Sequence, residues 1–212
     1  MHKYLILIMM IPVILLISCN LTPQSQKGAG SPKKDNKKVL ILSSSPRKGG
    51  NSDILCDKFM EGAKAAGHQV EKVFLNDLNI NFLRTNDDYE DRTNLTAIDD
   101  TPEIVDKMIN ADVIVMATPI YYYNMSGMMK TMMDRIFERE SELTYKDFYF
   151  IMTSGDPDIK AMDCALLGFR NFMLCTPTSK EKGIIYGTGV GNKGDVNDKP
   201  VMQEAYEMGR NI

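Results

Sequence analysis

The sequence predicts an α/β fold in which a five-stranded parallel sheet is covered by helices on both faces. Short apolar runs alternate along the chain with segments whose apolar residues recur at helical spacing. Turns rich in Ser, Pro, Gly and Asn separate the two kinds of segment. Because each strand-like run is followed by a helix, neighbouring strands are expected to be parallel.

The predicted strands are 39–43, 70–75, 113–117, 148–152 and 183–186, and the predicted helices are 52–66, 101–109, 126–139, 160–174 and 201–210. The first strand is an apolar run that enters a Ser/Pro/Gly-rich turn, as a buried parallel strand does. The first helix carries its apolar residues at helical spacing and should stop at Gly67. Those residues are Ile54, Leu55, Phe59, Met60 and Ala63.

A polar stretch, 76–100, follows the second strand and is long for a simple connection, so it is expected to be functional or partly structured. The second helix should begin at Pro102, with Thr101 or Asp100 as its cap. The strand 113–117 is the most apolar of the five, and the remaining elements continue the alternation to the end of the chain.

Composition excludes several classes of function. The net charge of −3 gives no basic face for a nucleic acid. Only two histidines are present, which argues against a histidine base or a histidine metal site. Beyond Cys19, the three cysteines Cys56, Cys164 and Cys175 are expected to be buried free thiols, because their odd number does not indicate a disulfide framework.

Residues 1–19 are interpreted as a lipoprotein signal peptide. Lys3 precedes an apolar run, 4–17, that is short for a membrane-spanning helix, which needs about 20 apolar residues. The run ends in Leu-Ile-Ser-Cys, which resembles the lipobox of bacterial lipoproteins, whose cysteine becomes the lipidated N-terminus after cleavage. The alternative is an uncleaved signal anchor in which Cys19 is incidental.

Residues 20–37, rich in Ser, Pro, Gly, Gln, Asn and Lys, are predicted to be a flexible tether. Residues 38–212 then form the folded domain. With a lipid on Cys19, this domain would be held on a bacterial membrane, on its extracytoplasmic side.

Function is expected in the loops after the first, third and fourth strands, because open parallel sheets bind ligands at the carboxyl ends of their strands. The first of these loops, Ser43–Ser52, combines hydroxyls, two glycines, an arginine and a helix start, which are the groups that bind a phosphate. It is neither a Walker loop nor a Gly-x-Gly-x-x-Gly motif. Alone, it is also compatible with a solvated turn.

The run Ser-Pro-Arg-Lys-Gly-Gly-Asn-Ser at 45–52 resembles the phosphate loop of the NAD(P)H-dependent FMN reductase family, which has a flavodoxin-like fold. Thr-Pro-Ile-Tyr-Tyr at 118–122, followed by Lys130, Asp134 and Arg135, is similar to the second signature of that family. The tail, 191–195 and 205–209, is also similar, so the resemblance covers essentially residues 38–212.

The resemblance implies FMN as the cofactor and assigns residues to it. The phosphate would be held by Ser45, Arg47, Asn51 and Ser52. The isoalloxazine would be wrapped by Pro119, Ile120, Tyr121 and Tyr122, with Asn124 nearby. The last flavin-contacting turn would be Thr153, Ser154 and Gly155. Lys130, Asp134 and Arg135 are expected to cap or pair structurally.

The resemblance further implies an oxidoreductase that passes two electrons from NAD(P)H or another donor, through FMN, to a quinone, a flavin or another small acceptor. Two alternatives stay open: a membrane-tethered electron carrier fed by a membrane partner, and a module whose flavin site has decayed. Relatives called iron–sulfur flavoproteins carry cluster cysteines after the second strand, and 79–100 has none. No metal site is therefore expected.

A homodimer or tetramer is implied by the family. The helix 126–139 also starts with more apolar residues than one face needs, so some are expected to pack on a partner. These are Met125, Met128, Met129, Met132 and Met133.

Overall fold

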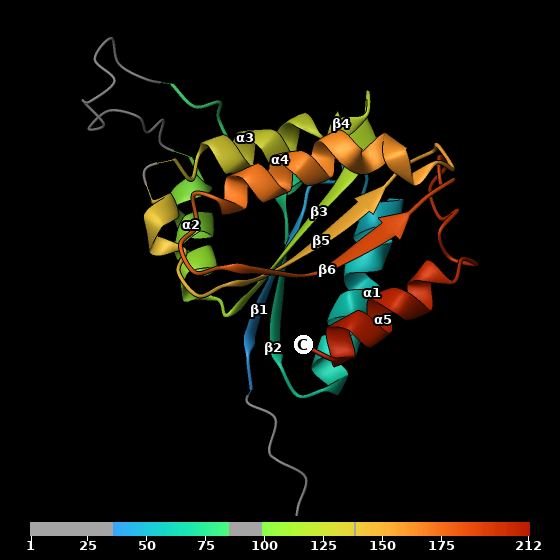
Figure 1. The fold of residues 1–212 in the computed structure, drawn as a ribbon, viewed down its shortest axis with the longest axis horizontal. Coiled ribbons are helices and arrows are strands. Elements are labelled where there is room, and N and C mark those ends of the chain that lie inside the picture. The colour runs from blue at the N-terminus through green and yellow to red at the C-terminus, as the bar shows by residue number, and fades with distance from the viewer. Residues whose placement is uncertain (1–35, 85–98, 138) are drawn as a thin grey trace, which may run out of the picture. The chain divides into compact units, whose positions relative to one another are not determined.

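The computed structural model describes residues 36–84, 99–137 and 139–212, which form one sheet with helices on both faces (Figure 1). The predicted signal peptide, Cys19 and the tether up to residue 35 lie outside the described residues. The segment 85–98 lies outside them as well, so the structure describes the polar stretch 76–100 only at its two ends.

Five parallel strands follow the order β2-β1-β3-β5-β6, which confirms the predicted flavodoxin-like fold class. These strands are β1 Lys38–Ser43, β2 Gln69–Phe74, β3 Val113–Tyr121, β5 Asp147–Thr153 and β6 Lys180–Gly187. The expected number of strands was wrong, because a sixth, β4 Asn124–Met125, pairs antiparallel with the end of β3. Two residues are too few to produce a recognisable strand pattern.

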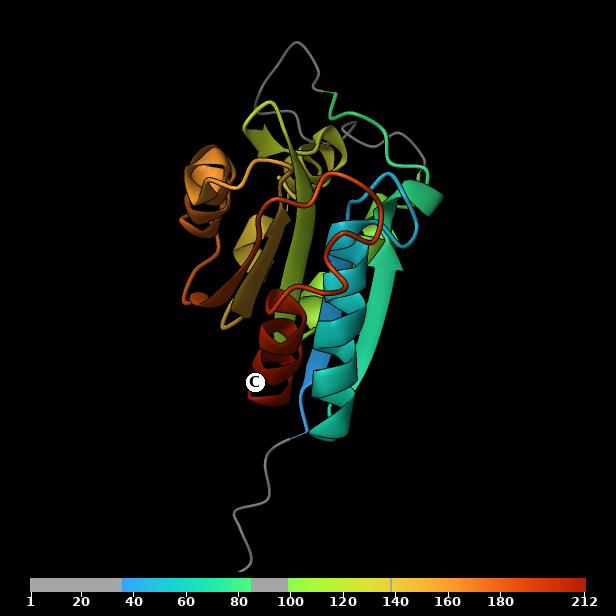
Figure 2. The same cartoon turned by 90° about the vertical axis from the view of Figure 1, so that its right-hand side faces the viewer.

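The helices cover the sheet from both sides. On one face lie α1 Asn51–Ala65 and α5 Val201–Arg210, side by side in Figure 2. On the other lie α2 Thr101–Asn110, α3 Gly127–Asp134 and α4 Asp163–Met173. Short 3₁₀ turns complete the described elements: η1 Leu75–Asp77, η2 Glu140–Glu142 and η3 Ile159–Met162.

The central strands are buried on both sides because successive side chains point to opposite faces. In β1, Val39 and Ile41 pack toward α1 and α5, whereas Leu40 and Leu42 pack toward α2, α3 and α4. None of the helices in the described ranges is both long and apolar enough to cross a membrane.

Helix α3 ends at Asp134, five residues before the predicted end, because the chain tightens there into turns with bonds from Ile136 N–H to Met133 O and from Phe137 N–H to Asp134 O. The methionines at its start do not need a partner chain. Four are buried and Met128 packs against the same core.

The expectation for the cysteines was correct only for Cys56, which lies on the buried face of α1, and burial raises the pKa of its thiol. Cys164 and Cys175 are exposed. Cys164 lies on the outer face of α4, and Cys175 follows the end of that helix. Neither position contributes to the core.

Arg135 forms a buried ion pair with Asp99, whose side chain is 0% exposed, and also donates to the carbonyl of Asn81 at 3.0 Å. Lys130 and Asp134 form a second, exposed pair on α3. These contacts confirm the structural role expected for the three residues. Burial acts to raise the pKa of Asp99, but hydrogen bonds from Arg135 and from two backbone N–H groups outweigh it and lower the pKa from 3.8 to about 2.

Asp99→Asn should lower the free energy of unfolding by about 3 kcal/mol at neutral pH, because it leaves the guanidinium of Arg135 buried without its counter-charge. Since the pKa of Asp99 is lower in the folded protein, the wild-type advantage is complete above pH 3.8 and is lost as the pH falls toward 2. Urea unfolding of both proteins between pH 2 and 7 measures this. Asp134→Asn, which breaks only the exposed pair, should change stability by less than about 0.5 kcal/mol, and an equal effect of both variants would contradict the account.

Candidate functional site

The carboxyl ends of β1, β3, β5 and β6, together with the four loops that follow them, enclose a cavity of about 220 Å³. Its lining residues are Ser45, Arg47, Asn51, Ser52, Pro119, Ile120, Tyr121, Thr153, Gly155, Val190 and Gly191. The structure therefore brings together every predicted cofactor-binding residue except Tyr122, Asn124 and Ser154.

The first loop, Ser44–Gly50, is folded tightly over the start of α1. Gly49 has a φ of +65°, and a Cβ on Gly50 would lie 2.5 Å from Ser45 Oγ, so both positions require glycine. The hydroxyl of Ser45 is bonded within the loop, to the N–H and carbonyl of Arg47. Within the described residues, no side chain caps the N-terminus of α1, which leaves its first N–H groups available to an anion.

Ser52 indicates most clearly where a ligand would bind. The residue is 1% exposed, and its Oγ has no hydrogen-bond partner among the described residues. A buried hydroxyl without a partner destabilises a protein by about 1–3 kcal/mol. Because Ser52 lines the cavity at the start of α1, a ligand oxygen in the cavity would satisfy it.

Asn51 lines the cavity, but its side-chain amide is already occupied. Its Nδ2 donates to the carbonyls of Val190 and Asn192 at 3.0 and 2.8 Å. Its Oδ1 accepts from the N–H groups of Gly194 and Val196 at 3.1 and 3.4 Å. The amide therefore has a structural role, and the backbone N–H of Asn51 is the group through which this residue could hold a phosphate.

The positive charge around the first loop comes from two sides. Arg47 reaches across the cavity to the carbonyl of Gly191 at 3.4 Å. Lys193 lies beside Gly49, with its Nζ 3.3 Å from where a Cβ of that glycine would stand. Neither cation forms an ion pair within the described residues, so both are available to an anion.

A buried carboxylate, that of Asp53, holds the first loop in place through hydrogen bonds. It accepts hydrogen bonds from the N–H of Gly49 at 2.9 Å and from Ser43 Oγ at 2.9 Å. Lys72 balances its charge at 3.0 Å and also pairs with Asp57. Burial acts to lower the pKa of Lys72, but its hydrogen bonds with the two carboxylates outweigh it and raise the pKa. Lys72 is therefore positively charged at neutral pH.

The second loop turns back on itself as the β3–β4 hairpin. Pro119, Ile120 and Tyr121 line the cavity, and Tyr121 is 44% exposed at its mouth. Tyr122 and Asn124 point elsewhere. Tyr122 is fully exposed, and the side-chain Oδ1 of Asn124 accepts from the N–H of Met125.

Hydroxyl groups join the second loop to the first. Ser44 Oγ and Ser126 Oγ lie 2.8 Å apart, and Ser44 Oγ donates to the carbonyl of Ala117. Thr118 Oγ1 accepts from the N–H of Ser126 at 2.9 Å. These buried hydrogen bonds fix the first loop relative to the β3–β4 hairpin, and so fix two walls of the cavity.

The third and fourth loops form one unit. The N–H of Val190 donates to the carbonyl of Ser154, and the Ser154 hydroxyl accepts from the N–H of Asp156, so Ser154 is occupied outside the cavity. Val190 and Gly191 were not predicted as site residues. The run Gly-Thr-Gly-Val-Gly at 187–191 was the available signal, because alternate glycines after a strand allow a close backbone approach.

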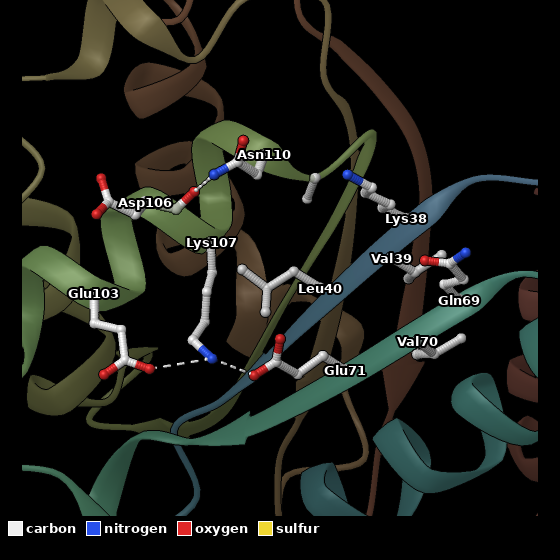
Figure 3. A pocket seen from close by; sticks show the side chains of 11 residues that line it. Lys38, Val39, Leu40, Gln69, Val70, Glu71, Glu103, Asp106, Lys107 and Asn110 are labelled. Atoms are coloured by element: carbon white, nitrogen blue, oxygen red, sulfur yellow. Dashed lines mark hydrogen bonds and ion pairs between the residues drawn. The ribbon is translucent and has the colours of Figure 1, made fainter.

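A second cavity, of about 380 Å³, lies at the opposite edge of the sheet, against the amino ends of β1 and β2 (Figure 3). Lys107 of α2 lies between the carboxylates of Glu71 and Glu103, at 2.5 and 3.3 Å, and its charge is already balanced. This cavity is remote from the four loops. In the described part of the chain, His, Cys, Asp and Glu side chains form no group that could hold a metal ion.

The cavity at the loops has two chemically different ends. Its closed end, at the buried residues Ser45 and Ser52, offers a hydroxyl and backbone N–H groups, and the exposed Arg47 lies beside it. Its mouth, at Tyr121, is apolar and aromatic. At about 220 Å³ it is smaller than complete ligand pockets, which measure roughly 300–1,000 Å³. The arrangement suits a ligand with an anionic group at one end and a flat ring that extends over the mouth.

Known proteins are similar to this chain in sequence and in fold. Residues 37–167 match the model of the NADPH-dependent FMN reductase family. An iron–sulfur flavoprotein from Archaeoglobus fulgidus is 29% identical over 184 residues, which cover 82% of this chain and 78% of the relative.

Two solved structures show the same fold at lower identity. The NAD(P)H:quinone oxidoreductase from Methanothermobacter marburgensis superposes with a TM-score of 0.64 at 18% identity, covering 84% of this chain and 96% of its own. An FMN-dependent NADH-azoreductase from Bacillus anthracis, solved with FMN, gives a TM-score of 0.61 at 17% identity, covering 82% and 96%. With the family match extending over more than half of the sequence, the chain belongs to the NADPH-dependent FMN reductase family and is a flavoenzyme that uses FMN.

Proposed function

We propose that the chain passes two electrons from NAD(P)H, through FMN bound in the cavity of the four loops, to a small acceptor such as a quinone or a flavin. The observation that carries the proposal is the hydroxyl of Ser52, which has no partner among the described residues and lies at the closed end of a cavity whose mouth is aromatic. FMN has the matching shape: a phosphate at one end and a large planar ring at the other.

The residues present fit this cofactor. Ser52 Oγ, Arg47 and the first N–H groups of α1 would hold the phosphate. Pro119, Ile120 and Tyr121 would lie against the ring. Bound FMN supplies the two-electron chemistry itself, so this chain needs no acid or base of its own in the cavity. The side chains of the cavity would bind and orient the cofactor and exclude water from it.

A second candidate function is an electron carrier that takes electrons from a membrane partner. The observation that favours it is the lipobox-like leader ending at Cys19. A domain outside the cytoplasm would lack NAD(P)H, which is largely cytoplasmic. Both candidates use the same FMN site and differ only in the donor.

An iron–sulfur cluster has no place in this proposal, because no cysteine occurs between Cys56 and Cys164.

A homodimer or tetramer is also proposed on the resemblance to the family. Its test is the molar mass of the FMN-loaded protein by light scattering, where a monomeric mass would reject it.

Ser52→Ala should weaken FMN binding by roughly 10- to 100-fold, which is the effect of losing one hydrogen bond to a charged group, about 1.5–3 kcal/mol. The apo-protein should not lose stability, because the hydroxyl has no partner to lose. Fluorescence titration with FMN and thermal unfolding of the apo-protein measure the two effects.

Ser179→Ala is the matched control. Its hydroxyl is bonded to the carbonyl of Leu143 at 2.9 Å and lies outside the cavity lining. It should lower the stability by about 1 kcal/mol and leave FMN affinity unchanged. A Ser52→Ala protein that binds FMN as tightly as wild type would remove the main support for the site.

Anaerobic stopped-flow mixing separates the two candidate functions. The proposed reductase should lose the visible absorption of its bound FMN when NADH or NADPH is added. If neither nucleotide bleaches the flavin while dithionite does, the reductase is rejected and the carrier is favoured. A protein that takes up no FMN would reject both.

The proposed attachment of the protein to a membrane depends on a lipid on Cys19. We expect bacteria that express the full chain to incorporate labelled palmitate into it and to remove the leader, and Cys19→Ala to abolish both the label and the cleavage. A wild-type chain that stays in the membrane at full length without the label would instead indicate an uncleaved signal anchor.

A further inference from the structure

A buried negative charge lies beside the loop that would bind the phosphate. Asp53 is only 4% exposed and is the third residue of α1, directly after Ser52. Its carboxylate accepts a hydrogen bond from the N–H of Gly49 at 2.9 Å, so the charge is in direct contact with the backbone of the loop. Because like charges repel, this carboxylate, if it were not balanced, would weaken the binding of an anion at the same helix start.

The charge that balances Asp53 comes from another element, the edge strand β2. Lys72 Nζ lies 3.0 Å from Asp53 Oδ1, and it also pairs with Asp57, one turn further along α1. Strand β2 runs beside α1 in Figure 2, and the side chain of Lys72 is 20% exposed. An ion pair that is largely sheltered from water is screened by salt much less than one on the surface.

Neither Lys72 nor Asp53 lines the cavity, and β2 contributes no residue to the lining. Their influence on a bound cofactor is therefore electrostatic, or is transmitted through the backbone of the loop. Charges in a partly buried site interact over several ångströms. This field acts on the phosphate of FMN, which is negatively charged, far more than on the oxidised flavin ring, which is neutral.

We propose that Lys72 determines the preference of the site for a phosphorylated flavin, because it neutralises the carboxylate of Asp53 beside the phosphate loop. The inference rests on the proposed function and deepens it. It adds a specificity-determining residue that lies outside the cavity, on a strand that does not line it.

The test compares FMN with riboflavin, which lacks the phosphate, by fluorescence titration of the full chain freed of its flavin. Lys72→Met keeps a long side chain but removes its charge. It should weaken FMN binding about tenfold, because the charge of Asp53 then opposes the phosphate. Riboflavin binding should change by less than about twofold, because riboflavin carries no charge.

A second variant removes both charges and should restore the affinity for FMN. In Lys72→Met/Asp53→Asn, the new amide can still accept from the N–H of Gly49 and can donate to Ser43 Oγ, so the loop keeps its contacts. FMN should bind within about threefold of wild type. Asp53→Asn alone should bind FMN at least as tightly as wild type, although it loses an ion pair. A purely structural role of the pair predicts neither result.

Lys58→Met is the matched control for the loss of one positive charge. Lys58 also contacts α1, on which it lies, but it pairs with Glu61 at 2.7 Å on the surface and does not line the cavity. Its replacement should change the affinity for FMN by less than about twofold.

Several outcomes would overturn the inference. One is a Lys72→Met protein that loses affinity for FMN and riboflavin equally, which would indicate a loosened loop, and another is unchanged affinity for FMN. A third is a double variant that binds FMN no better than Lys72→Met. Breaking a buried ion pair is strongly destabilising; if Lys72→Met does not fold, Asp53→Asn decides, and weaker FMN binding than wild type rejects the inference.

The wild-type protein separates this inference from the proposed function. Wild-type protein that binds FMN, with variants that give any of these outcomes, overturns the role of Lys72 alone. Wild-type protein that takes up no FMN overturns the proposed function, and this inference with it.

Discussion

The cavity depends on the side chain of Asn51. Its amide makes four hydrogen bonds to the loop after β6, from Val190 to Val196, and so binds the start of α1 to a segment about 140 residues later in the chain. The amide is buried with both its donors and its acceptor in use, which makes it costly to separate the two segments. Without these bonds the cavity would lose the wall formed by Val190 and Gly191.

Hydrogen bonds among the polar groups around the cavity also determine which groups a ligand can bind. Polar groups that could compete for a ligand are occupied by one another: Ser45 with Arg47, Ser44 with Ser126, and Asp53 with Gly49 and Lys72. What remains free at the closed end is the hydroxyl of Ser52 and the first N–H groups of α1. The site is thus pre-organised for an anion, and the aromatic mouth is left for a ring.

The order of strands and helices could be predicted because apolar runs and helical spacing are local properties of the sequence. The loops at the carboxyl edge followed from the topology, and most of the proposed cofactor residues do line the cavity. The hairpin with β4 could not be predicted, because Tyr-Tyr is not a sequence that signals a two-residue turn. The role of Asn51 was hidden for another reason: its four partners are distant in sequence, so only the folded chain reveals them.

The central claim is that the closed end of the cavity binds the phosphate of FMN. The most direct measurement compares FMN with riboflavin, which has the same ring but no phosphate, by titration into the apo-protein. Several charge-assisted hydrogen bonds at about 1.5–3 kcal/mol each predict that FMN binds at least about 100-fold more tightly. Equal affinity for the two flavins would contradict the account, because the ring alone would then supply the binding energy.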